Sequence, residues 1–132
     1  MDLNLEEFTR RYVAVWNEPD PTIRRRSIAQ LWTDDAVQYL ESSEYRGHSE
    51  LEPRVEEAYE KFVASGGFRF EPAAATVAHH DTIVLRTKML PAGGGEVAWT
   101  GLSFLELAPD GRIHREHQYA LPLEPTPVTA AR

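Results

Sequence analysis

The chain has 132 residues, of which 42% are hydrophobic and 27% charged, so it can form one globular domain but is too short for two. It contains no cysteine, which excludes a disulfide framework, a thiolate metal site and a cysteine nucleophile, and its net charge of -7 argues against nucleic acid as a partner. No apolar run is long enough to span a bilayer and the N-terminus does not resemble a signal peptide, so we expect a cytoplasmic protein with no membrane partner.

Helical periodicity marks three segments in the first half of the chain. Apolar residues recur at three- and four-residue steps through residues 5–16. Two prolines within residues 17–21 end this helix, because the residue before a proline is pushed out of the helical region. A second apolar stripe runs through residues 23–32. A third helix follows Gly47 and ends at the glycines of residues 65–67.

Strand patterns dominate the second half. A short strand candidate, Ala36–Leu40, precedes the third helix. After residue 67 the periodicity changes to alternation, and it predicts four strands: Phe68–Ala78, Thr82–Leu90, Glu96–Leu107 and Arg112–Leu121. We therefore expect one domain over residues 1–121. The proline-rich residues 122–132 are expected to form an extended or frayed tail, since proline cannot pair in a central strand.

The order of these elements predicts an α+β fold. Three N-terminal helices would pack on one face of a curved antiparallel sheet, because each element must bury its apolar side against another. No stretch repeats at a fixed period, which excludes a solenoid or propeller. A curved sheet closed by helices leaves a cone, and such a cone is a natural site for a pocket.

The reactive residues argue against a metal or a cofactor. None of the five histidines has the i, i+4 spacing on a helix or the i, i+2 spacing on a strand that is typical of metal ligands. His114 and His117 are three residues apart, so a regular strand would place them on opposite faces. The run Gly93–Gly95 precedes no helix and is typical of a hairpin tip. Acid–base chemistry in an apolar pocket, or binding alone, remains.

Four acidic residues are candidates for such chemistry. A carboxyl group buried among aromatic side chains has a raised pKa and can act as acid or base near neutral pH. Asp34 and Asp35 are typical of a turn and cap, and Glu41 follows a strand. Glu116 lies in the middle of the last strand, where it would face solvent, a second copy of the chain or the pocket.

Five stretches of the sequence carry a family resemblance: Arg11–Asp20, Leu31–Ala36, Tyr45–His48, Gly101–Leu107 and Asp110–Ile113. In this order the chain resembles the nuclear transport factor 2-like superfamily over roughly residues 5–121. It is most similar to the SnoaL-like group, which includes polyketide cyclases and ketosteroid isomerases. The resemblance implies a cone-shaped α+β barrel with a hydrophobic pocket, usually dimeric, but it implies no single chemistry.

The catalytic residues of these relatives carry over only in part. Tyr12 matches the tyrosine that donates to the oxyanion in ketosteroid isomerases, and it is also a typical core tyrosine. Their general-base aspartate falls at Tyr39–Glu41, where this chain has no aspartate. Their second oxyanion donor, an acid, falls at Ser103. The base of SnoaL-like cyclases falls at Gln118–Leu121, again without an acid. Arg86 is the only central-strand arginine that could match the Asp–Arg–Asp set of limonene epoxide hydrolases, and it lacks its aspartates.

Strand alternation predicts which side chains would face the pocket. If Ser103 faces it, the resemblance places His114, Glu116 and Gln118 on the same side of the sheet. The opposite side of the sheet, the outer face, would carry Leu102, Phe104, Arg115, His117 and Tyr119. We expect this outer face to mediate a homodimer.

The sequence therefore predicts a small-molecule pocket protein without a metal or cofactor. Tyr12 would be the oxyanion donor and Glu116 the acid–base residue of an isomerase, cyclase or lyase that acts on a small apolar substrate. The expected substrate contacts are Trp16, Tyr59, Phe62, Ser103, His114 and Gln118. The alternative is a non-catalytic ligand-binding or dimerisation module, which the missing carboxylates favour.

Overall fold

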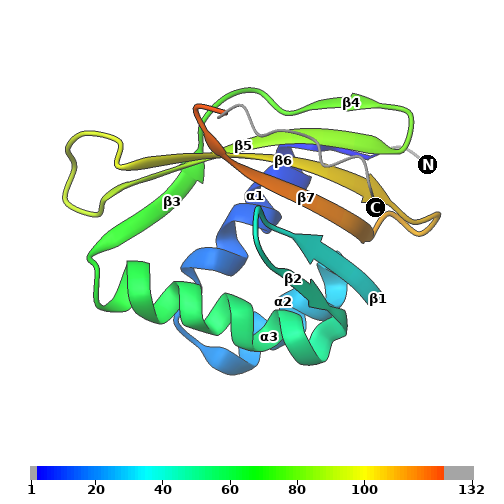
Figure 1. The fold of residues 1–132 in the computed structure, drawn as a ribbon, viewed down its shortest axis with the longest axis horizontal. Helices are drawn as coiled ribbons and strands as arrows, with labels where there is room; N and C mark the ends of the chain where they lie inside the picture. The colour runs from blue at the N-terminus through cyan, green and yellow to red at the C-terminus, as the bar shows by residue number, and fades with distance from the viewer. Residues whose placement is uncertain (1–2, 124–132) are drawn as a thin grey trace.

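The structure, a computed structural model, describes residues 3–123 and places three helices on one face of a curved sheet (Figure 1). The helices are α1 (Leu5–Asn17), α2 (Pro21–Leu31) and α3 (Gly47–Ala58), and a π-helical turn, η1 (Tyr59–Ala64), continues α3. Asn4 caps α1 by accepting from the backbone N–H of Glu7 at 3.0 Å. Asp20 caps α2 by accepting from the N–H groups of Thr22 and Ile23.

The sheet has seven strands: β1 (Trp32–Tyr39), β2 (Glu44–Arg46), β3 (Phe68–Pro72), β4 (Val77–His79), β5 (Thr82–Pro91), β6 (Trp99–Leu107) and β7 (Ile113–Leu121). Their order is β2-β1-β7-β6-β5-β3, and β4 pairs with the first residues of β5. The α+β prediction is therefore confirmed. The helices cover the concave face of the sheet, as Figure 1 shows.

Two details of the sheet differ from the prediction. The sheet is mixed rather than antiparallel, because β1 runs parallel to β7. It is also open, with β2 at one edge and β3 at the other, so it does not close into a barrel. Alternation along a strand shows which residues share a face, but it does not reveal the neighbouring strand or its direction.

The strand boundaries also differ from the prediction, and two of the differences matter most. The segment predicted as one strand, residues 68–78, is two strands that both pair with β5. The ladder of β3 ends at Pro72, whose nitrogen has no hydrogen to donate. The first strand begins at Trp32 rather than at Ala36 and thus includes the Asp34–Asp35 pair that is typical of turns.

A bulge in β7 contradicts the prediction for His114. Leu107 pairs with Ile113 and Glu106 with Arg115, so His114 is an extra residue in the ladder. Ile113 and Glu116 both point into the core, whereas His114 is exposed. The predicted alternation holds only after the bulge.

Three aromatic rings from two elements meet in the core between the helices and the sheet. Tyr12 and Trp16 lie one helical turn apart on α1, and Trp32 is the first residue of β1. Their ring centroids are 5.7–6.4 Å apart. Each such pair contributes about 0.5–1.5 kcal/mol beyond the burial of its area. This packing fixes Tyr12 against the sheet at the level of Glu116.

Two predictions concern the limits of the domain. No helix within residues 3–123 is long and apolar enough to cross a bilayer. Of the predicted tail, residues 122–132, only Pro122 and Leu123 belong to the described part of the chain, and residues 124–132 lie outside it. The domain boundary at residue 121 stays a prediction.

Candidate functional site

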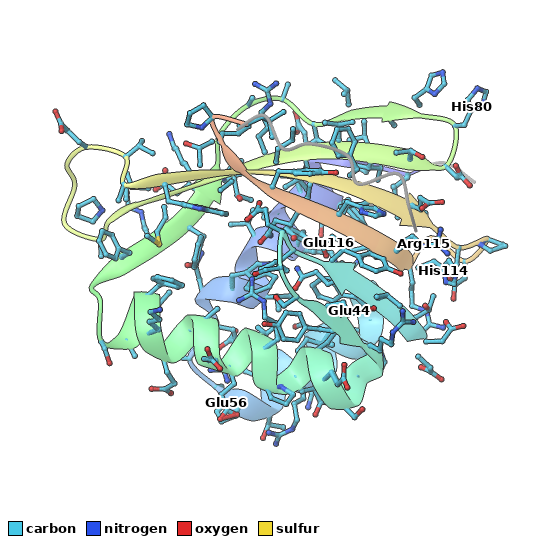
Figure 2. The ribbon with its side chains drawn as sticks, viewed as in Figure 1. Glu44, Glu56, His80, His114, Arg115 and Glu116 are labelled. Atoms are coloured by element: carbon cyan, nitrogen blue, oxygen red, sulfur yellow. The ribbon has the colours of Figure 1, made fainter. Side chains whose placement is uncertain are left out.

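A buried carboxyl group is the most unusual polar feature of the interior. Glu116 of β7 has no exposed surface. The Tyr12 hydroxyl donates to its Oε2, Ser103 Oγ donates to the same oxygen at 3.3 Å, and Trp32 Nε1 donates to Oε1 at 3.2 Å. We call these four residues the carboxyl network. Figure 2 shows Glu116 between the sheet and the helices, and His114 and Arg115 at the end of the sheet.

Each member of the carboxyl network reaches the centre for a local reason. The apolar stripe of α1 turns Tyr12 toward the sheet. Trp32 ends α2 and starts β1, so its indole lies where helix and sheet meet. Ser103 lies on β6, which pairs with β7 along its whole length and brings the serine hydroxyl beside Glu116.

Burial determines the protonation of this network. Removal from water raises the pKa of Glu116, while the hydrogen bonds from Tyr12, Trp32 and Ser103 act in the opposite direction without cancelling it. Burial, together with the adjacent Glu116, raises the pKa of Tyr12 well above its ordinary value. Tyr12 therefore keeps its proton at neutral pH, and Glu116 holds a proton more readily than a solvated glutamate.

A cavity of about 300 Å³ lies beside this network. Its walls come from α1, from α3 with η1, from four strands and from the residues that follow β1. They are formed by Tyr12, Trp16, Leu40, Glu41, Arg54, Glu57, Ala58, Lys61, Phe62, Phe70, Thr87, Met89, Trp99, Gln118 and Ala120. Tyr12 is the member of the carboxyl network that lines the cavity, so Glu116 reaches it only through the tyrosine. Within residues 3–123, no group of three or more His, Asp or Glu side chains could hold a metal ion.

The predicted site residues divide into three groups: members of the carboxyl network, residues of the cavity wall and residues outside the cavity. The structure brings Tyr12, Ser103 and Glu116 together in the carboxyl network. It places Trp16, Phe62 and Gln118 on the cavity wall.

Tyr59 and His114 lie outside the cavity, contrary to the prediction. The Tyr59 ring packs under the guanidinium of Arg24 from α2, 4.6 Å from its centroid. Tyr59 is absent from the cavity wall, whereas Phe62, three residues further along the helix, is part of it. His114 is turned outward by the bulge, and its Nδ1 lies 3.7 Å from a carboxylate oxygen of Asp35.

Sequence reasoning missed Arg54 on the cavity wall. Its guanidinium carbon lies 5.2 Å from the centroid of the Trp16 ring and 5.5 Å from that of Tyr45. Its Nε donates to Oε1 of Gln38 at 3.2 Å. A signal was present, because Arg54, Ala58 and Phe62 follow each other at four-residue steps and thus share one helix face. Since Phe62 was expected in the pocket, Arg54 belonged there too.

Comparison with known proteins agrees with this architecture. The model of the SnoaL-like domain family matches residues 9–116. None of the curated proteins matches the chain.

Three solved structures illustrate the shared fold. An Agrobacterium tumefaciens protein, provisionally named an isomerase of the SnoaL-like family, is 22% identical with a TM-score of 0.78, over 88% of this chain and 96% of its own. A Sinorhizobium meliloti protein, provisionally named a polyketide cyclase, is 20% identical with a TM-score of 0.63, over 89% and 96%. An NTF2-like protein with a cystatin-like fold from Novosphingobium aromaticivorans is 15% identical with a TM-score of 0.65, over 89% and 80%.

These structural likenesses show the fold alone, because fold and chemistry separate readily at such identities. The family model, in contrast, spans α1 through the middle of β7 and includes every member of the carboxyl network. The chain belongs to the SnoaL-like domain family.

Proposed function

We propose that the chain binds a small, largely apolar organic molecule in the cavity and isomerises or cyclises it by proton transfer, without a cofactor. The observation that carries the proposal is that Tyr12 lines the cavity while its hydroxyl contacts the buried carboxyl of Glu116. A volume of about 300 Å³ is at the small end of ligand pockets, and the aromatic walls suit an apolar body. Two solved relatives carry provisional names of the same two reaction classes.

In this proposal Tyr12 stabilises a developing negative charge. In the structure the Tyr12 hydroxyl donates to Oε2 of Glu116. Burial raises the pKa of Glu116 and so favours its protonated form, in which the same contact can reverse, with Glu116 donating to the Tyr12 oxygen. The Tyr12 O–H is then free to donate to the carbonyl oxygen of a bound molecule. A donor already in place where charge develops lowers the barrier without reorganisation.

A carboxylate on the cavity wall supplies the base. Glu41 lines the cavity, and its Oε1 accepts from the backbone N–H of Ala120 at 3.1 Å, which holds the side chain in place. It takes a proton from the carbon next to the carbonyl group, and the enolate forms with its oxygen on Tyr12. Return of the proton to a different carbon completes an isomerisation. Attack of the enolate on a second carbonyl carbon, whose oxygen then takes the proton back from Glu41, completes a cyclisation.

The test uses the step that both reactions share. Small cyclic ketones from cyclohexanone to cyclodecanone are incubated with the protein in D₂O, and NMR follows deuterium uptake at the α-carbon. We expect exchange with the wild type and, for Tyr12→Phe, a rate lower by about 10²–10³, the usual loss of an oxyanion donor. Tyr59→Phe is the matched control, because it removes the same hydroxyl outside the cavity.

A second candidate function is binding without catalysis. The enclosure of Glu116 by three protein donors favours it, because such a network also serves to hold α1, β1, β6 and β7 together. Ketone binding without exchange, seen as quenching of Trp16 and Trp99 fluorescence, would establish this candidate instead. If no ketone of the series binds or exchanges deuterium, both candidate functions are overturned.

A further inference from the structure

Arg54 is the feature of the cavity that a purely apolar ligand leaves unexplained. It projects from α3 into the cavity wall and is only partly exposed. Its guanidinium lies against the rings of Trp16 and Tyr45, and its Nε–H is used by Gln38. The position of the cation is thus fixed by two aromatic faces and one hydrogen bond.

The outer nitrogens of this guanidinium have no acceptor in the described part of the chain. No carboxylate lies within 4.0 Å of Arg54, and neither Nη atom donates a hydrogen bond there. Arg24 provides the contrast, since it also stacks on an aromatic ring, that of Tyr59, but donates to the backbone carbonyls of Glu18 and Pro19. The guanidinium of Arg24 thus donates to acceptors within the protein, whereas the two outer nitrogens of Arg54 remain available to a bound ligand.

Another donor without an acceptor lies next to Arg54. The indole N–H of Trp16, on the ring beneath the guanidinium, is buried and has no hydrogen-bond partner within residues 3–123. The charged groups on the rest of the wall are Glu41, Glu57 and Lys61, and all three are exposed to water, which screens their charge. Arg54 and Trp16 thus place unused donors side by side at the cavity.

We propose that the molecule bound in the cavity carries a carboxylate, held by Arg54, at one end of an apolar body. This inference rests on the proposed function, because it names the class of ligand for the same cavity. The planar guanidinium matches the two oxygens of a carboxylate, and its aromatic neighbours keep it from turning away. The apolar body would lie against four apolar side chains of the wall: Phe62, Phe70, Met89 and Trp99. Phe70 is packed edge-on between Phe62 and Trp99, with centroid distances of 6.5 and 6.4 Å.

The test compares acids with neutral molecules of the same shape. Isothermal titration calorimetry measures the binding of 3-phenylpropionate, cyclohexylacetate and octanoate, and of the three corresponding primary amides. We expect the wild type to bind at least one acid about tenfold or more tightly than its amide, the usual gain from a charge-assisted hydrogen bond. Added salt should weaken the binding of the acid, because it screens the charge pair, and should leave the binding of the amide unchanged.

Variants assign the preference to Arg54. Arg54→Met keeps an apolar stem over Trp16 and removes the charge, so the variant should bind the acid no more tightly than its amide. Arg54→Lys keeps the charge and should retain part of the preference for the acid. Arg10→Met is the matched control, because Arg10 lies on α1 outside this cavity. If Arg54→Met does not fold, the acid–amide comparison and the salt dependence of the wild type still decide.

The outcomes separate this inference from the proposed function. Equal binding of acids and amides by the wild type, or a preference that survives in Arg54→Met, would overturn the carboxylate assignment and leave the cavity as an apolar site. Failure of all six probes to bind, together with the absence of ketone binding, would overturn the proposed function and the inference with it.

Discussion

At the scale of single residues, Glu116 decides how the centre of the molecule behaves. Its carboxyl group is out of contact with water, and its two oxygens accept from Tyr12, Ser103 and Trp32. A buried carboxylate with fewer donors would be far more costly, because the lost hydration would go uncompensated. The network therefore stabilises α1 against the sheet, and its burial favours the protonated form of Glu116.

The stability of the protein should depend on pH through Glu116. Burial raises its folded-state pKa above the ordinary 4.5, so the folded chain keeps this proton over a range in which the unfolded chain has lost it. The free energy of unfolding contributed by this group is present below about pH 4.5 and declines as the pH rises through the raised pKa. Glu116→Gln does not titrate, so its stability relative to the wild type should improve as the pH rises across this range.

Urea unfolding at a series of pH values from 4 to 8 measures this difference. The matched control is Glu56→Gln, which makes the same replacement on the exposed side of α3, far from Glu116 in Figure 2. If the wild type instead gains stability relative to Glu116→Gln as the pH rises, the three donors outweigh burial and Glu116 is a stable buried anion. Glu116 would then not donate to the Tyr12 oxygen, and the Tyr12 O–H would stay engaged with the carboxylate.

At the scale of the elements, the bulge in β7 separates two groups of side chains. Residues after it alternate as an ordinary strand, with Glu116 and Gln118 on the inner side. His114 before it is exposed, and its Nδ1 lies 3.7 Å from a carboxylate oxygen of Asp35. The strand thus delivers two polar residues to the interior rather than three.

Replacement of His114 should therefore have little effect. His114→Ala removes one exposed contact with Asp35, so the free energy of unfolding should change by less than about 0.5 kcal/mol. Binding of 3-phenylpropionate should be unchanged. Gln118→Ala, on the same strand but on the cavity wall, is the comparison and should weaken that binding. Weaker binding in His114→Ala would mean that β7 has no bulge and that its alternation runs unbroken.

The elements also show how far the sequence leads. Helical stripes placed Tyr12, Trp16 and Phe62 on the correct faces, because the period of a helix is fixed by its backbone. Tyr59 was misplaced because it is also apolar and close in sequence, and only the packing of Arg24 on its ring separates it from Phe62. The bulge at His114 and the pairing of β1 with β7 depend on contacts between distant segments, and no local pattern encodes them. Arg54 was overlooked as a charged residue on a helix, although its spacing from Phe62 pointed to the cavity.

At the scale of the whole molecule, the sheet has one side that the helices leave uncovered (Figure 1). On this outer face Phe104 of β6 is 37% exposed and Tyr119 of β7 is 38% exposed, and their ring centroids are 6.0 Å apart. Leu102, which was also expected on this face, is only 7% exposed, so it adds little to the exposed apolar surface here. Adjacent exposed aromatic rings on an otherwise regular sheet are typical of a contact surface. We propose that two copies of the chain associate through this face.

A charge placed in this patch should dissociate such a dimer. In Phe104→Lys, each copy would bring an ammonium group into an apolar contact, and the two-fold symmetry of a homodimer would place the charge there twice. We expect the wild type to have the mass of a dimer in size-exclusion chromatography with light scattering at micromolar concentration, and the variant to have that of a monomer. Ile23→Lys is the matched control, since Ile23 is 41% exposed but lies on α2, away from the outer face. A monomeric wild type, or a Phe104→Lys variant that remains dimeric, would show that the outer face is not the interface.

Because the cavity lies on the helical side of the sheet, the monomeric variant should still bind 3-phenylpropionate, which separates assembly from ligand binding.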